Sequence, residues 1–116
     1  MPGFRTDEEA TIAELKTRVG AFVDARNWRR FHDGKNLAMS IAIEAAELME
    51  HFQWGERSEY APDRLSAEQL DEIRFEVADI MIYTLSLCRT MGIDIASTVQ
   101  AKLEKNERRF PVENSR

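Results

Sequence analysis

Two pairs of acidic residues give this 116-residue sequence its clearest chemical signal. Glu44 and Glu47 form the first pair, and Glu76 and Asp79 form the second. Side chains three residues apart lie on one face of a helix, with Cβ atoms about 5–6 Å apart. If two helices place these faces together, four carboxylates converge and repel one another, and a divalent cation relieves the repulsion. Oxygen-only ligands favour Mg²⁺ or Mn²⁺, whereas zinc prefers histidine or cysteine.

Each acidic pair belongs to a longer polar stripe on an otherwise apolar helix. Apolar residues flank both stripes, and no lysine or arginine lies between Lys35 and Arg57. A solvated helix face is usually broad and mixes charges of both signs, whereas these stripes are narrow. A single acidic pair is more often exposed to solvent than bound to metal, so the pattern alone leaves both interpretations open. The stripes consist of Asn36, Ser40, Glu44, Glu47 and His51, and of Glu72, Glu76, Asp79, Tyr83 and Ser86.

The first acidic pair lies on the second of two helices predicted in the N-terminal half. A capping box of Thr6 and Glu9 predicts that the first helix begins at Thr6, and its apolar periodicity ends near residues 26–27. The second helix is expected over Lys35–Trp54, with Gly55 as its stop signal.

The second acidic pair lies on a third predicted helix. Ser66 and Gln69 form another capping box that opens this helix, and Gly92 ends it. Asp94 is suited to cap a fourth helix, which ends before Pro111. Four helices with short connections predict an all-α fold resembling a four-helix bundle with antiparallel packing.

Composition indicates that residues 1–116 form a single globular domain. The net charge of -5 and the lack of a basic block argue against a nucleic-acid polymer as partner. Cys88 is the single cysteine, and its apolar neighbours indicate a small buried side chain. The N-terminus has no apolar signal core, and the longest uncharged run, Ile80–Cys88, is too short to span a membrane. A cytoplasmic location is therefore expected.

The sequence around the acidic pairs resembles the MazG-like superfamily of all-alpha nucleoside triphosphate pyrophosphohydrolases. Glu44-Ala45-Ala46-Glu47 and Glu76-Val77-Ala78-Asp79 look like its ExxE…ExxD signature, although fuller forms carry a further Glu where this chain has Ile43. Further matching segments extend the resemblance over residues 24–111 and point to the dCTP pyrophosphatase branch. They are Phe31-His32, Asn36-Leu37, Phe52-Gln53-Trp54, Ile82-Tyr83 and the stretch from Lys102 to Pro111.

The resemblance implies an activity and a cofactor. The activity is Mg²⁺-dependent hydrolysis of nucleoside or deoxynucleoside triphosphates, in particular dCTP or modified dNTPs, to the monophosphate and pyrophosphate. Such a reaction serves nucleotide-pool housecleaning. The two acidic pairs match the family's catalytic magnesium ligands, and Mn²⁺ could substitute. Family members form dimers, or tetramers built from dimers, with the site near a subunit interface.

The resemblance also implies a set of substrate-binding residues. Lys102 and Asn106 match residues that contact phosphates, and Tyr83 and Arg109 are further candidates for that role. Trp28 and Trp54 match aromatics that line the base pocket, where they could sandwich a base, and His32 lies beside it. A polar residue that contacts the base is expected on the first helix, but Val19 occupies that place.

Three other interpretations of the acidic stripes can be weighed. A ferritin-like di-metal bundle needs Glu-x-x-His elements, and neither central helix has one. A non-catalytic helical interaction module would use the stripes to bind a basic partner. A nucleotide-sensing module would keep the fold without turnover, although all four acidic positions of the signature are filled.

Overall fold

A computed structural model of the chain describes residues 3–112, and all regular elements in that range are helical. The predicted four helices are present and no strand occurs over these residues. No helix among them is long and apolar enough to cross a membrane. The elements are α1 (Ile12–Ala25), η1 (Arg29–Phe31), α2 (Gly34–Glu50), η2 (Arg57–Tyr60), α3 (Ala67–Met91) and α4 (Ile95–Arg109), where η denotes a 3₁₀ helix.

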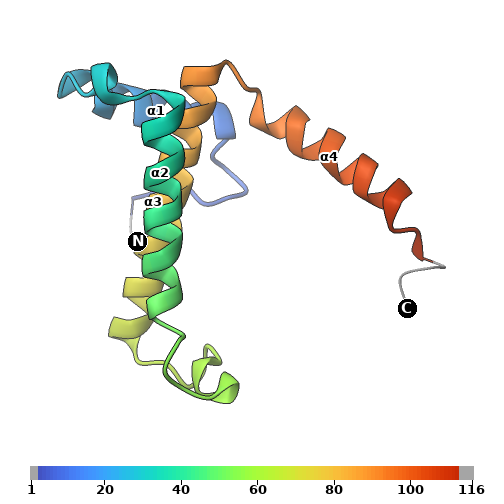
Figure 1. Cartoon of the computed structure of the whole chain (residues 1–116). Coiled ribbons are helices and arrows are strands. Elements are labelled where there is room, and N and C mark those ends of the chain that lie inside the picture. Colours follow the sequence, from blue (N-terminus) through green and yellow to red (C-terminus); the bar gives the residue numbers. More distant parts are fainter. Residues whose placement is uncertain (1–2, 113–116) are drawn as a thin grey trace.

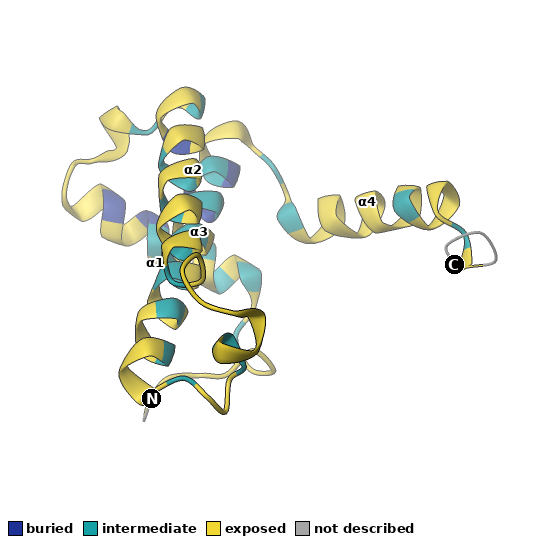
Figure 2. Ribbon diagram, turned by 60° about the horizontal axis from the view of Figure 1, so that its bottom comes forward, coloured by how far each residue is buried: buried dark blue, intermediate teal, exposed yellow. Residues whose placement is uncertain are grey.

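The body of the molecule consists of three helices. α2 and α3 lie antiparallel and side by side, and α1 crosses α3 near the C-terminal end of α3 (Figure 1). The buried apolar side chains, which include the predicted Cys88, gather where the three helices meet (Figure 2). They are Val23, Leu37, Leu85 and Cys88. This small core fixes one end of the α2–α3 pair and leaves the rest of its surface open.

α4 does not join this body. It extends away from the other helices after the turn at Gly92 (Figures 1 and 2). The radius of gyration is 17.2 Å, whereas a compact domain of this length has about 13 Å. The predicted all-α fold with four helices is confirmed, but the predicted packing of all four as one bundle is not found within the single chain, because α4 contacts the other helices little.

α1 is tied to α3 by polar contacts. Arg89 of α3 donates hydrogen bonds to the carbonyl of Gly20 at 3.3 Å and to the carboxylate of Asp24 at 2.6 Å. The guanidinium lies so close to Gly20 that a Cβ atom there would be 2.8 Å from Cζ of Arg89. The same guanidinium holds the pKa of the Asp24 carboxyl below its ordinary value. These contacts join α1 to α3 in addition to the apolar core.

The predicted ends of α3 and α4 agree with the structure. The side-chain oxygen of Ser66 accepts a hydrogen bond from the backbone amide of Gln69 at 3.1 Å, and Oε1 of Gln69 accepts one from the backbone amide of Ser66 at 2.9 Å. Gly92 ends α3 in the left-handed region, with φ of 66°. Asp94 caps α4 by accepting from the amide of Ser97 at 3.2 Å.

The predicted start of α1 and end of α2 are wrong. Glu9 does accept a hydrogen bond from the amide of Thr6 at 3.0 Å, but only a turn follows. The helix begins at Ile12, because Thr11 caps it by accepting from the amide of Glu14.

α2 ends at Glu50, with His51 as its C-cap, four residues before the predicted end. Gly55 is therefore not the residue that stops the helix. It lies against η2, where an added Cβ would come 2.5 Å from the hydroxyl of Tyr60.

Candidate functional site

The antiparallel pairing of α2 and α3 brings the acidic pairs together. Carboxylate oxygens of Glu44, Glu47 and Glu76 all lie within 4.8 Å of one another. We call the polar strip between the two helices the seam. Its members are Ser40, Glu44 and Glu47 of α2, His51 directly after α2, and Glu72, Glu76, Asp79 and Tyr83 of α3.

The carboxylates in the seam are short of hydrogen-bond donors. Glu44 and Glu76 are half-buried, and Oε2 of each is buried without a donor in the described part of the chain. The pKa of Glu44 is raised from 4.5 to about 7, first by a hydrogen bond shared with Glu76, then by burial and by the neighbouring Glu47. Two buried oxygens that lack donors, in an oxygen-only set, suit a hard divalent cation.

The fourth predicted ligand, Asp79, lies outside the group of converging oxygens. It is half-buried on α3, close to one turn beyond Glu76. Tyr83 is half-buried a further turn along. Asp79 is therefore positioned at the edge of the site, and its role as a ligand stays a prediction.

The two tryptophans expected at the base lie beyond opposite ends of α2. Trp28 is 45% exposed and packs edge-to-face on Phe22, with ring centroids 5.7 Å apart. Trp54 is 87% exposed in the loop that follows α2. A helix of 17 residues is about 25 Å long, so these rings cannot sandwich one base within a single chain. His32 is half-buried and directly follows η1, near the Trp28 end.

The residues expected to contact phosphate are also separated from the carboxylates. Lys102, Asn106 and Arg109 all lie on α4, which extends away from the seam (Figure 1). Lys102 and Arg109 are exposed, and Asn106 is half-buried. One chain therefore does not bring them to the acidic residues.

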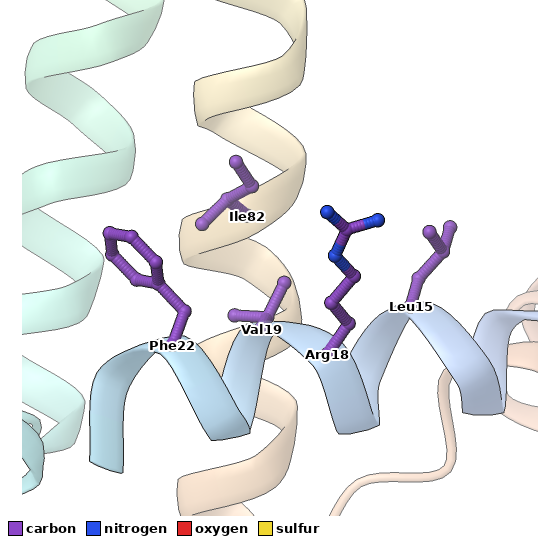
Figure 3. A pocket seen from close by; sticks show the side chains of 5 residues that line it. All are labelled: Leu15, Arg18, Val19, Phe22 and Ile82. Carbon is purple, nitrogen blue, oxygen red and sulfur yellow. The ribbon is translucent and has the colours of Figure 1, made fainter. Parts of the chain in front are cut away.

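A groove that the sequence did not reveal lies between α1 and α3 (Figure 3). It has a volume of about 340 Å³ and lies at the level of Tyr83 along α3, since Ile82 lines it. The sequence feature that corresponds to this groove is the apolar periodicity of the first helix. The same periodicity is also expected of a helix face that packs in an ordinary core. The lining residues are Leu15, Arg18, Val19, Phe22 and Ile82.

Comparison with known proteins gives consistent matches. The MazG-like family model matches residues 39–116, a range that includes both acidic pairs and α4. The chain is 32% identical to dCTP pyrophosphatase 1 of Bos taurus over 97% of its own length and 67% of that protein. The identity to dCTP pyrophosphatase 1 of Homo sapiens is 30%, over 99% of this chain and 68% of that protein.

A solved structure shares the arrangement of helices. The crystal structure of a pyrophosphatase from Archaeoglobus fulgidus superposes with a TM-score of 0.80 at 39% sequence identity. The match covers 93% of this chain and 99% of that chain. Because the match includes nearly the whole chain, the helix pair α2 and α3 that carries the seam is part of the shared fold.

Proposed function

Because the chain belongs to the MazG-like family, we propose that it hydrolyses nucleoside triphosphates to the monophosphate and pyrophosphate. The observation that carries this proposal is the convergence of three carboxylates, two of them with buried oxygens that lack donors. The named relatives are dCTP pyrophosphatases, so dCTP or a modified dNTP is our first choice of substrate. The corresponding role is housecleaning of the nucleotide pool, and we expect it in the cytoplasm.

The donor set supports Mg²⁺ as cofactor, with Mn²⁺ as a substitute. Glu44, Glu47 and Glu76 would hold the ion, with Asp79 completing the set. A bound ion would neutralise the triphosphate and lower the pKa of a water ligand. Glu47 is the exposed member of the converging three, so it is our candidate to accept the proton of the attacking water.

The substrate is expected to lie along the seam. The base would enter the groove at the Tyr83 end, where Val19 and Phe22 offer apolar surface and Trp28 packs on Phe22. His32 lies near the same end. The α-phosphate would then lie at the carboxylates, where its bond to the leaving pyrophosphate is broken.

We further propose that the chain functions as a homodimer or a homotetramer. Its accessible surface is 9504 Å², about 3,000 Å² more than a compact protein of this mass exposes. An excess of that size is typical of obligate interfaces. A partner could also supply what one chain lacks at the seam, namely Trp54 and the phosphate-binding residues Lys102, Asn106 and Arg109.

A pyrophosphate-release assay tests the activity. The full chain is given a panel of canonical and 5-modified NTPs and dNTPs, once with Mg²⁺ and once with EDTA. We expect metal-dependent release of pyrophosphate and monophosphate, and the rank order of rates identifies the base. Absence of release from every substrate by folded, metal-loaded protein would contradict the proposal and favour a non-catalytic interaction or nucleotide-sensing module.

A further inference from the structure

The seam continues one helical turn past the carboxylates, to a histidine and a glutamate that face each other. Nδ1 of His51 lies 3.9 Å from a carboxylate oxygen of Glu72. The His51 side chain is 25% exposed and that of Glu72 is 55% exposed. His51 follows Glu47 by four residues and Glu72 precedes Glu76 by four, so both extend the acidic faces in the same direction.

His51 differs from the other seam residues in its charge. The remaining members are acidic or neutral, and His51 alone can carry a positive charge. Arg74 of α3 is paired with Asp71 at 2.7 Å. Among the residues of the seam, His51 is therefore the one that can offer a positive charge to a triphosphate, at the end opposite the groove.

The order of groups along the seam assigns this end to the leaving phosphates. Along α3 the groove lies at the level of Ile82 and Tyr83, the converging carboxylates follow, and His51 with Glu72 comes last. A nucleotide with its base in the groove and its α-phosphate at the carboxylates directs its β- and γ-phosphates towards His51. In its doubly protonated form, the imidazole donates one N–H towards Glu72 and the other to a phosphate oxygen.

We propose that His51 is a further substrate-binding residue, which contacts the phosphates that leave as pyrophosphate, and that Glu72 positions its ring. This inference rests on the proposed function, because it takes the substrate to be a nucleoside triphosphate bound along the seam. A purely structural His51 would only interact with the C-terminal end of α2, where it is the C-cap. The two roles differ in whether pyrophosphate binding depends on the side chain.

The test measures binding of inorganic pyrophosphate and of the nucleoside monophosphate to the full chain by calorimetry with Mg²⁺ present. We expect His51→Leu to weaken pyrophosphate binding about tenfold and to leave monophosphate binding unchanged, in line with the loss of one hydrogen bond to a charged group. Glu72→Gln should weaken pyrophosphate binding less. His51→Gln, which keeps an N–H near the position of Nε2, should recover part of the affinity.

Controls separate this inference from the proposed function. Glu50→Gln removes an exposed carboxylate of α2 outside the seam and should bind both ligands like the wild type. Unchanged pyrophosphate binding by His51→Leu, or equal weakening for both ligands, would overturn the inference even if the wild type hydrolyses triphosphates. If the wild type hydrolyses none, the proposed function fails, and the pyrophosphate titrations still decide the role of His51. If His51→Leu unfolds, His51→Gln and Glu72→Gln provide the comparison.

Discussion

Glu44 carries the strongest functional signal of any single side chain. Its pKa in the folded chain is about 7, against an ordinary value of 4.5. Between these pH values the folded protein holds a proton that the unfolded chain has released. The free energy of unfolding therefore falls as pH rises from about 4.5 to about 7, and Glu44 has no further effect above that range. Glu9, Asp24 and Asp94 have lowered pKa values, so their effects lie at lower pH.

Metal-free protein should show this pH dependence in thermal or urea unfolding between pH 5 and 8, measured in EDTA. Glu44→Gln mimics the protonated carboxyl, so the variant should lose most of the slope and be more stable than the wild type at pH 8. Glu50→Gln is the matched control and should keep the slope. Equal slopes for the wild type and Glu44→Gln would show that the Glu44 proton is not the cause.

Added Mg²⁺ should raise the melting temperature, because an ion that binds only the folded state stabilises it. The shift should be larger at pH 8 than at pH 6, since the ion competes with the proton on Glu44. Glu47→Gln should reduce the shift at both pH values. A wild-type melting temperature that does not respond to Mg²⁺ at pH 8 would mean that the three carboxylates bind no magnesium.

Among the helices, the attachment of α1 depends on Arg89. Arg89→Met keeps much of the side-chain volume and removes the bonds to Gly20 and Asp24. Because the guanidinium is partly buried, with 27% of its side chain exposed, we expect a loss of about 1 kcal/mol in the free energy of unfolding. Arg74→Met is the control, since its pair with Asp71 is exposed on both sides and its removal should change stability little. Equal stability of the two variants would mean that α1 is held by apolar contacts alone.

Helix ends were predictable from sequence where one local signal acts without competition. Gly92 adopts a left-handed conformation that favours glycine, and the Asp94 side chain accepts a hydrogen bond from the backbone amide of Ser97, three residues later. The start of α1 was not predictable in this way, because Thr6 and Thr11 are both followed three residues later by Glu and both make capping contacts. This local signal does not distinguish the two starts, and the helix that packs against α3 begins after Thr11.

The site shows the same division between local and non-local information. Spacing alone places Glu44 and Glu47 on one face, and antiparallel pairing of two such faces suffices to bring Glu76 to them. Spacing does not fix the distances between side chains. The spacing alone therefore groups Asp79 with Glu44, Glu47 and Glu76, although the oxygens of those three converge more closely. The groove depends on where α1 crosses α3, and periodicity cannot report this position.

For the molecule as a whole, the surface of α4 indicates assembly. Ile95, Val99 and Leu103 recur every four residues on one side of the helix, and Val99 and Leu103 are 47% and 53% exposed. Leu103→Asp should shift the protein towards monomers in light scattering coupled to gel filtration, because burial of the new charge in an interface is unfavourable. Ala101→Asp places the same charge on the opposite side of α4 and should not change the mass. An unchanged mass for Leu103→Asp would exclude this side of α4 from the interface.

Assembly also decides where the residues that we propose to bind phosphate can act. Lys102 and Asn106 lie on nearly the same side of α4 as Val99, since they follow it by three and seven residues. Packing of that side onto a partner would therefore bring both residues into the interface. If they reach the partner's seam, each active site combines the seam of one chain with α4 of another.

Two inactive variants should then complement each other. Lys102→Ala and Glu47→Gln each damage both sites of a homodimer, whereas a mixed dimer of the two holds one site with neither change. Mixed dimers isolated with two affinity tags should recover about half of the wild-type activity, because closed two-fold symmetry gives two sites per dimer. A mixture of Glu44→Gln with Glu47→Gln is the control and should recover none, since both changes lie in the same seam. No recovery with Lys102→Ala would mean that the seam and α4 of one chain act together, which requires α4 to fold back onto its own body.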